Sequence, residues 1–393
     1  IMYNGGAQCV KVAHRDHGMC RTNVWVDDQQ GLEVARNIAA FTSVPLGDGP
    51  GMVPIFDGRL PDGSRVNGTI PPVSPDGPTL TIRKFREDPL TMIDLIKFGT
   101  VNLRLAAMMW VWIEGLDSRP ANFVIAGGTG SGKTTVALHR LSYLTFENPT
   151  HFAPQNMMFM VFGKAMRDYV GHVLPHLGVS GLRVHTWKSW SRRVFQQHFP
   201  RWPRVTSNAI PELVQRIKLH PNTMRRLRLY IKQTQHLPND IDQVYQDWAH
   251  ILTDFGSIRA DFPEVTDSLK QKAQSWLAHQ TDLMSIHMEG SQQEEDEPAF
   301  LDPEDISLLL YAYQLRVGRL TEGNREISLS HLVIDEVQDF SPLEILILLG
   351  ICDEKQSVTL AGDTRQHISQ SAGFSSWSDF LRQIGVQSTA LST

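Results

Sequence analysis

The spacing of hydrophobic and polar residues changes along this chain, and each change marks a different kind of structure. In the first fifth of the sequence, short runs of alternating apolar and polar residues lie between turns rich in Gly, Pro and Asp. Such a run over 79–85 predicts a β-strand. Residues 28–41 instead place Leu32, Ala35 and Ile38 on one helical face, which predicts a helix. The pattern therefore indicates a small α+β region at the start of the chain.

Beyond residue 89 the pattern becomes mainly helical and is interrupted by three short apolar runs. Residues 89–113 and most of 200–330 carry helical spacing, with a loop expected over 290–298. The apolar runs, which predict buried strands, cover residues 122–126, 331–334 and 357–361. The first is followed by glycines and a helix expected over 134–144, and the other two end in loops with acidic residues. Strands that alternate with helices in this way predict an α/β fold with a parallel sheet.

Composition excludes several classes of protein. The chain has 393 residues, of which 41% are hydrophobic and 20% charged, so it can bury a sizeable core and is not a disordered tail. Its longest apolar runs, such as 105–113, fall short of the ~20 residues that span a bilayer, and no signal peptide opens the chain. Three cysteines cannot form a disulfide framework, so we expect a reducing, cytoplasmic setting.

Charge is distributed unevenly, although the formal net charge is only −5. Residues 183–232 hold 12 Lys and Arg against one acid, whereas residues 233–307 hold 16 Asp and Glu against three basic residues. In the basic stretch, arginines such as Arg192 and Arg193 alternate with aromatic residues. Guanidinium groups neutralise phosphates and aromatic rings stack on bases, so this mixture favours a channel for single-stranded DNA. The alternative is a solvated helix face whose aromatic side chains are buried.

The most specific motif is a phosphate loop over residues 127–134, which fits the pattern G-x-x-x-x-G-K-[ST] between an apolar strand and a helix. Its glycines let backbone N–H groups turn inward around a triphosphate, at the positive end of the following helix. We expect Lys133 to reach the β- and γ-phosphates and Thr134 to help hold Mg²⁺. The residues predicted to bind the nucleotide are Gly128, Thr129, Gly130, Ser131, Gly132, Lys133, Thr134 and Thr135. The alternative is a plain Gly-rich turn before a helix.

Acidic residues follow the next two predicted strands. Asp335 and Glu336 come directly after the strand over 331–334, and we expect Asp335 to hold Mg²⁺ and Glu336 to polarise the attacking water. The alternative is a strand that ends in solvated carboxylates. The strand over 357–361 leads to Gln366, which this order of motifs places where it can sense the γ-phosphate. Lys133, Glu336 and Gln366 are therefore the predicted catalytic residues.

From the phosphate loop onward, the chain resembles the first RecA-like domain of UvrD-type DNA helicases. The matching residues are Gly130 to Arg140, Asp335 to Asp339, Ala361 to Gln366, and a segment from Met158 to Pro175 that leads to Thr186 and Trp187. This resemblance implies an ATP-hydrolysing domain that carries a mostly helical insertion. It also implies contacts between single-stranded DNA and Thr186, Trp187, Arg192 and Arg193.

Upstream, the chain resembles the N-terminal domain of CpaF-type secretion and pilus-assembly ATPases. The match covers residues 1–135 and is carried by Gly58 to Asn67, Leu80 to Phe85 and Asp94 to Gly99. In that family, arginines of the N-terminal domain reach the nucleotide, so the resemblance implies this role for Arg65 and Arg83. It also implies that the N-terminal domain docks to secretion or pilus machinery.

The two resemblances overlap only at the phosphate loop, so the sequence reads as a hybrid. A natural fusion, a deliberate chimera and a sequence joined wrongly at that loop would each produce it. The chain opens on Ile1 rather than Met, so we expect that its true N-terminus is missing. It stops at 390–393, where the helicases' next motif would begin, and we expect no second RecA-like domain. An arginine from that second domain is worth ~10³–10⁵ in rate in such enzymes, so we expect slow hydrolysis and no unwinding.

Together these observations predict an α/β protein: a P-loop NTPase with a RecA-like parallel sheet and a helical insertion, preceded by a small α+β domain. The expected domains are residues 1–115 at the N-terminus, 116–200 with 326–393 for the ATPase, and 201–325 for the insertion. The expected function is ATP binding with Mg²⁺, weak ATP hydrolysis and binding of single-stranded DNA. A secretion or pilus-assembly ATPase subunit and a non-functional hybrid are the alternatives.

Overall fold

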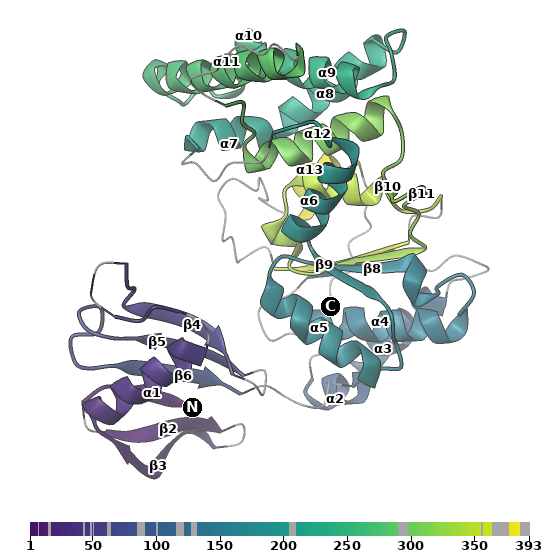
Figure 1. Ribbon diagram of the computed structural model, residues 1–393. Helices are drawn as coiled ribbons and strands as arrows, with labels where there is room; N and C mark the ends of the chain where they lie inside the picture. Colours follow the sequence, from purple (N-terminus) through teal and green to yellow (C-terminus); the bar gives the residue numbers. More distant parts are fainter. Residues whose placement is uncertain are drawn as a thin grey trace. The chain divides into compact units, whose positions relative to one another are not determined.

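The computed structural model divides the chain into two compact units, residues 1–89 and 90–393 (Figure 1). It describes all residues except 7, 15–16, 42–43, 48, 50, 61–63, 85–90, 100, 115–121, 127–131, 204–209, 290–297, 355–356, 364–376 and 386–393. Each unit has a sheet of its own. In the described part of the chain, no helix is both long and apolar enough to span a bilayer.

The first unit is an antiparallel sheet with one helix packed on it. Its strands are β1 (Met2–Asn4), β2 (Gln8–His14), β3 (Gly18–Val26), β4 (Ile55–Arg59), β5 (Arg65–Thr69) and β6 (Thr79–Arg83), in the order β3-β2-β1-β6-β5-β4. Helix α1 (Asp28–Phe41) has the predicted bounds and buries Ala35 and Ala39 against Phe56, Val66 and Leu80. Because strand residues alternate between faces, the other face of β5 and β6 is left polar and partly exposed. The predicted α+β region is confirmed.

The second unit is built on a parallel sheet. Its strands are β7 (Phe123–Ala126), β8 (Met157–Val161), β9 (Arg183–Thr186), β12 (His331–Ile334) and β13 (Val358–Gly362), in the order β7-β13-β12-β8-β9. Every residue of β8, β12 and β13 is buried, which explains why they read as continuous apolar runs rather than alternating ones. The strands predicted over 122–126, 331–334 and 357–361 are confirmed with shifts of one residue at most.

Helices cover both faces of this sheet, and Figure 1 shows α4 and α5 on one side and α6 and α13 on the other. The helices outside the insertion are α2 (Met92–Lys97), α3 (Leu103–Glu114), α4 (Lys133–Glu147), α5 (Lys164–His176), α6 (Trp187–His198), α13 (Pro342–Leu349) and α14 (Trp377–Gln383), with short 3-10 turns η1 (Pro154–Asn156) and η2 (Val337–Asp339). Helices α2 and α3 pack on α4 through Leu95, Val101, Met109 and Val136. Helical layers on both faces of a parallel sheet confirm the predicted α/β fold class.

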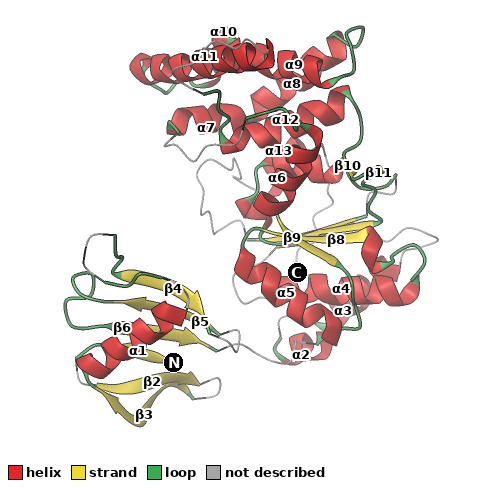
Figure 2. Cartoon of the chain, in the orientation of Figure 1, coloured by secondary structure: helices red, strands yellow, loops and turns green. Residues whose placement is uncertain are grey.

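Between β9 and β12 the chain forms a stack of helices followed by a short hairpin (Figure 2). These elements are α7 (Glu212–Leu219), α8 (Pro221–Gln233), α9 (Ile241–Thr253), α10 (Phe255–Asp261), α11 (Asp267–Glu289), α12 (Pro303–Arg316), β10 (Thr321–Glu322) and β11 (Arg325–Glu326). Their apolar residues share one continuous core with the sheet, including Trp248 of α9 and Leu332 of β12. The helical insertion is therefore packed onto the sheet rather than separated from it.

Two buried ionic clusters fix the ends of α12. At its start, Lys218 Nζ lies 2.5 Å from Asp302 Oδ2 and 2.7 Å from Asp305 Oδ2, and the three side chains are almost fully buried. Near its end, Arg316 donates to both carboxylate oxygens of Asp247, at 2.8 Å each. Buried charges are tolerated only when such partners compensate their desolvation. The basic and acidic stretches of the sequence thus meet in the interior of the insertion.

Candidate functional site

The N-terminus of α4 lies at the carboxyl edge of the parallel sheet, directly after the phosphate loop. Gly132 precedes this helix with φ of +80°, and a Cβ there would lie 2.9 Å from a methyl group of Leu95. Only glycine meets both conditions without strain. Residues Gly128, Thr129, Gly130 and Ser131, predicted to bind the nucleotide, lie outside the described residues. The strand and helix that flank them are present as β7 and α4.

Thr134 and Asp335 meet at this edge although they are 201 positions apart. The Thr134 hydroxyl donates a hydrogen bond of 2.7 Å to Asp335 Oδ2. Asp335 follows β12 and is fully buried, and Lys133, the first residue of α4, is buried as well. Burial raises the pKa of Asp335 to about 6, while the hydrogen bond from Thr134 and the charge of Lys133 act in the opposite direction. Thr135, the remaining residue of the motif, is half-buried in the first turn of α4.

This pair of oxygen ligands fits a magnesium ion. Mg²⁺ prefers hard oxygen donors, usually takes one or two protein carboxylates, and fills its other positions with water and substrate phosphates. Asp335 is a carboxylate removed from water, and its pKa is raised by that burial, so a cation beside it would relieve a real desolvation cost. Thr134 and Asp335 are the side chains that would hold the ion.

The loop after β12 has an unusual backbone. Glu336 has φ of +51° and ψ of +47°, a left-handed conformation that no other non-glycine residue adopts in the described ranges. Its carboxylate accepts a hydrogen bond of 2.6 Å from Gln338 Nε2, and Gln338 Oε1 accepts one of 2.9 Å from the backbone N–H of Asp363. No sequence pattern assigns a role of its own to Gln338. Gln366 lies outside the described residues.

Of the four predicted DNA contacts, only Arg192 is exposed and without an ion pair among the described residues. Thr186 is buried and caps α6, because its side chain accepts a hydrogen bond from the Ser189 N–H. Trp187 is 8% exposed and packs against Trp190, with ring centroids 5.6 Å apart. Arg193 is exposed but lies 2.6 Å from Glu322 Oε1.

The aromatic residues of the basic stretch are mostly in the core. Trp190, Phe195, Phe199 and Trp202 are all at most 8% exposed, which matches the interpretation of buried aromatics and leaves them unable to stack on bases. Several basic side chains also have internal acidic or phenolic partners. These pairs are Arg216 with Glu264, Arg226 with Asp261, and Arg228 with the Tyr311 hydroxyl.

Phe162 is an aromatic residue at the sheet's carboxyl edge and belongs to none of the predicted sites. It directly follows β8, is 53% exposed, and contacts Phe340 edge to face at 6.2 Å. The ring therefore offers an apolar surface close to the polar residues of this edge. The signal available in the sequence was its position, directly after five consecutive apolar residues and before Gly163.

In the first unit, Arg65 and Arg83 lie directly opposite each other on β5 and β6. Arg59 of β4 is the register partner of Arg65, so three arginines occupy one rung of the sheet. Arg65 and Arg83 are exposed and form no ion pair within the described residues. Like charges directly opposite each other destabilise a sheet, so the pair of Arg65 and Arg83 suits a bound anion.

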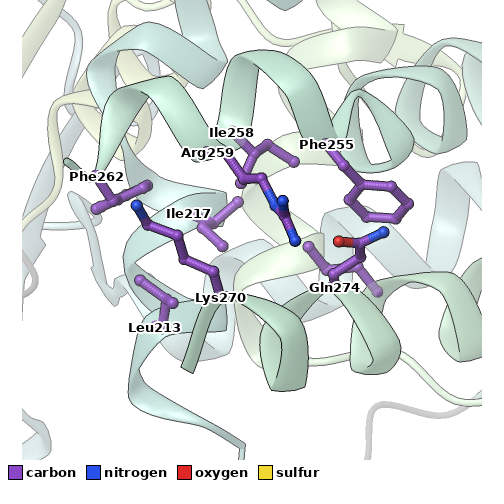
Figure 3. Close-up of a pocket in the computed structure, with 9 residues that line it drawn as sticks. Leu213, Ile217, Phe255, Ile258, Arg259, Phe262, Lys270 and Gln274 are labelled. Atoms are coloured by element: carbon purple, nitrogen blue, oxygen red, sulfur yellow. The ribbon is translucent and has the colours of Figure 1, made fainter. Parts of the chain in front are cut away.

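A pocket in the helical insertion lies apart from these residues (Figure 3). It has an apolar floor that includes Ile217 of α7 and Ile258 of α10, and Lys270 and Gln274 of α11 line it as well. It contains none of the residues that the sequence predicts to act on a nucleotide or on DNA.

Comparisons with known proteins give two families whose matches overlap. Residues 116–370 match the UvrD/REP helicase N-terminal domain, and residues 50–152 match the type II/IV secretion system protein family. The stretch common to both, 116–152, contains the phosphate loop and α4. This confirms the hybrid pattern seen in the sequence.

The individual relatives of the chain include an uncharacterized protein, a conjugal transfer protein and a DNA helicase. An uncharacterized protein of Methanocaldococcus jannaschii is 46% identical over 149 residues, which is 38% of this chain and 20% of that protein. The conjugal transfer protein TrbB of Rhizobium radiobacter is 41% identical over 85 residues, 21% of this chain and 25% of its own length. DNA helicase IV of Escherichia coli is 23% identical over 282 residues, 64% of this chain and 39% of that helicase.

The chain thus spans less than half the length of each of these relatives. The helicase match nevertheless covers well over half of the chain and includes the phosphate loop, Asp335 and Glu336. The chain belongs to the UvrD/REP helicase N-terminal domain family, and residues 50–152, which overlap that match at the phosphate loop, are similar to the type II/IV secretion system protein family.

Proposed function

We propose that the second unit binds Mg²⁺-ATP at the edge formed by α4 and β12 and hydrolyses it slowly. The observation that carries this proposal is the hydrogen bond between Thr134 and Asp335, since it brings the hydroxyl of the phosphate-loop motif onto the buried acid of a second motif. Lys133 supplies a cation in the same place. The backbone of Gly128 to Gly132 would surround the phosphates, as in other loops of this pattern.

Each of these residues has its own role in the proposed hydrolysis. Lys133 would bind the β- and γ-phosphate oxygens, while Thr134 and Asp335 would hold Mg²⁺, and that ion would neutralise charge on the phosphates. Glu336 takes a proton from the water whose oxygen attacks the γ-phosphorus. The bond from that phosphorus to the bridging oxygen breaks, and ADP and inorganic phosphate leave. Gln366 is proposed to contact the γ-phosphate.

Hydrolysis by these 393 residues alone should be slow. In related helicases, as the resemblance implies, the arginine that stabilises the transferring phosphoryl group comes from a second RecA-like domain. One parallel sheet is present among the described residues of this chain. Without such an arginine the rate falls by ~10³–10⁵, so the 393-residue polypeptide should bind ATP but not unwind DNA.

The test of this proposal is equilibrium binding of a fluorescent ATP analogue with and without Mg²⁺. Lys133→Ala should weaken binding at least tenfold, because the lysine meets two phosphates. Lys272→Ala is the matched control, since Lys272 is an exposed lysine of α11 in the insertion. A Lys133→Ala variant that binds as tightly as the parent would refute the proposal and leave the non-functional hybrid as the better account.

We also propose that single-stranded DNA binds along the carboxyl edge of the sheet. The supporting observations are the exposed ring of Phe162 beside Phe340, and Arg192, which has no acidic partner among the described residues. Thr186 and Trp187 would act by shaping this edge, since both are buried. A labelled oligothymidylate should bind with an affinity that falls as salt rises, because phosphate neutralisation releases counterions. An affinity for the oligothymidylate that does not change with salt concentration would argue against the proposal.

A second candidate function is that of a secretion or pilus-assembly ATPase subunit, and the arginine rung of the first unit favours it. Arg65 and Arg83 are proposed to reach the nucleotide's phosphates, as the resemblance implies, and the first unit to dock to secretion or pilus machinery. Replacing both arginines by Ala should then weaken ATP-analogue binding several-fold. Light scattering that shows a ring with ATP analogue, together with no DNA affinity, would favour this function over the first.

A further inference from the structure

Helix α1 packs on one face of the first unit's sheet, where Ala35 and Ala39 join Phe56 and Leu80 in a common core. Because side chains alternate along a strand, the residues between these core positions lie on the opposite face, where they are more exposed. Charged and aromatic residues that the register places there include Arg21 and Trp25 of β3, Lys11 of β2, Asp57 of β4, Arg65 of β5 and Arg83 of β6. This surface is the open face of the sheet.

The open face is basic. Asp57 is the only acidic residue within the described ranges of the six strands. On the same face Lys11 is the register partner of Arg21, and Arg65 is the register partner of Arg83. No ion pair joins these four cations to another described residue. Like charges directly opposite each other destabilise a sheet, so a bound chain of anions would relieve this repulsion at two places.

Trp25 adds an exposed aromatic ring to these cations. It is 70% exposed near the end of β3, and the next residue, Val26, packs with the core on the other face. Its register partner Cys9 lies two positions before Lys11 on β2, which places the ring on the same face as the pair of Lys11 and Arg21. Any base can stack on such a ring, since every base has a π-face.

The spacing across the sheet fits an extended polyanion. In the order β3-β2-β1-β6-β5, Arg21 and Arg65 are four strand positions apart, which is ~19 Å at ~4.8 Å per strand. Between them the face carries uncharged polar residues such as Asn4 and Thr79, which are register partners. Polar neighbours of this kind favour bases and sugars, which form hydrogen bonds, over the acyl chains of a lipid surface. Sheet faces that combine cations with exposed aromatic rings are known platforms for single-stranded nucleic acid.

We propose that the open face of the first unit binds single-stranded nucleic acid. Trp25 stacks on a base, and Lys11, Arg21, Arg65 and Arg83 neutralise phosphates along the bound strand. This site is distinct from the DNA contact proposed for the second unit, and it needs neither ATP nor the phosphate loop.

The test uses the full chain with Phe162→Ala, a substitution that weakens the DNA contact proposed for the second unit. Two further changes are then made on the open face. Trp25→Ala removes the exposed ring, whereas Lys11→Gln combined with Arg21→Gln removes two of the charges without removing the ring.

The matched controls lie on α1, which packs on the other face of the sheet. Phe41→Ala removes a ring that is 62% exposed at the end of this helix, and Arg36→Gln removes an exposed charge. Neither control should change the affinity for nucleic acid or its salt dependence.

Fluorescence anisotropy of a labelled oligothymidylate of about 15 nucleotides measures the affinity at several salt concentrations. Trp25→Ala should weaken binding ~5- to 100-fold, which is the range expected for the loss of one stacked base. Lys11→Gln with Arg21→Gln should reduce the slope of log affinity against log salt by about 1.4, or ~0.7 per phosphate contact. Ultraviolet cross-linking and mass spectrometry should place the oligonucleotide on the tryptic peptide of residues 22–36, which contains Trp25.

The inference is overturned if Trp25→Ala binds the oligothymidylate as tightly as Phe41→Ala does, or if the peptide of residues 22–36 carries no cross-link. Phosphatidylserine vesicles and polyglutamate are the competing anions. If either displaces the labelled strand as well as unlabelled oligothymidylate does at equal charge, the face recognises charge alone and the inference fails. Lys133→Ala should lose ATP-analogue binding and keep the cross-link, so failure of the proposed ATP site and failure of the open face are distinguishable.

Discussion

The hydroxyl of Thr134 lies 2.7 Å from a carboxylate oxygen of Asp335, across 201 positions of sequence. The strand order explains this approach, because β13 lies between β7 and β12 and all three strands run parallel. Their carboxyl ends therefore share one edge, where ligands of open α/β sheets bind. The chain between the two residues includes the helical insertion, and β12 brings it back to that edge just before Asp335.

Asp335→Asn should stabilise the protein while it weakens Mg²⁺-dependent binding of ATP. Burial raises the pKa of Asp335 to about 6, so above that pH the folded protein holds an ionised carboxylate that the unfolded chain would solvate better. Asparagine removes the charge and keeps one acceptor oxygen, either for the Thr134 hydroxyl or for the Glu336 N–H, which now bond to different carboxylate oxygens. Urea unfolding at pH 7.5 without Mg²⁺ should show a gain of about 1–3 kcal/mol. A loss of stability would show that the carboxylate is compensated in some other way.

The sequence predicts those features of the site that residues close together in the chain encode. The strands around the phosphate loop and around Asp335 each have a continuous apolar run with a distinctive neighbour, so a short window of sequence identifies them. The left-handed backbone of Glu336 and the bridge through Gln338 depend on how closely β13 approaches η2. That approach is a property of the assembled sheet, and no local pattern encodes it.

The distribution of charge along the sequence was the least reliable basis for predicting a DNA-binding surface, because residues far apart in the sequence neutralise each other. The basic stretch over 183–232 suggested a DNA channel, yet Arg226 pairs with Asp261 and Lys218 with Asp302 of the acidic stretch. These partners lie 35 and 84 positions away. The aromatic residues between the arginines were equally ambiguous, since the helical spacing that exposes one face buries the other.

Lys218→Met should be severely destabilising. The ammonium group of Lys218 is fully buried between Asp302 and Asp305, and its loss would leave two buried carboxylates without a cation. Breaking such a cluster costs about 3–5 kcal/mol, which urea unfolding would detect. The exposed Lys272→Met should stay within about 0.5 kcal/mol of the parent. If Lys218→Met is as stable as Lys272→Met, the cluster is not holding α12 in place.

Stability should fall as pH rises between about 4.5 and 7, and Glu344 should account for part of that fall. Burial raises the pKa of Glu344 from 4.5 to about 7, so the folded state binds a proton that the unfolded state has released over this window. The stabilising contribution is complete below the unfolded pKa and is lost as pH rises through the folded pKa. Glu344→Gln should be about 2 kcal/mol more stable than the parent at pH 8 and similar at pH 4.5. If Glu344→Gln and the parent are equally stable at pH 8 as well as at pH 4.5, the pKa of Glu344 is not raised in the folded protein.

Glu322→Gln should increase affinity for single-stranded DNA. Glu322 Oε1 lies 2.6 Å from Arg193 and Oε2 lies 3.2 Å from Arg183, so one carboxylate occupies two guanidinium groups that phosphates could otherwise bind. Arg183 begins β9, at the end of the strand opposite the carboxyl edge, and it also donates to the Gln155 carbonyl, so Arg193 is the guanidinium group that this substitution frees. The affinity should rise several-fold at low salt, and the salt dependence should steepen by about one counterion. Fluorescence anisotropy would measure both, with Glu326→Gln of the same hairpin as control. An unchanged salt dependence would mean that Arg193 does not face DNA.

Phe162→Ala should weaken binding of single-stranded DNA without affecting ATP-analogue binding. The ring is 53% exposed at the end of β8, and base stacking on such a ring contributes about 1–3 kcal/mol. Phe146→Ala is the control, because Phe146 is even more exposed, at 83%, but lies in the last turn of α4. The phosphate loop lies at the other end of that helix, before Lys133. If both variants lose affinity equally, stacking is unspecific. If only Phe162→Ala does, the DNA lies over the edge where Thr134 meets Asp335, and nucleotide and DNA share one end of the sheet.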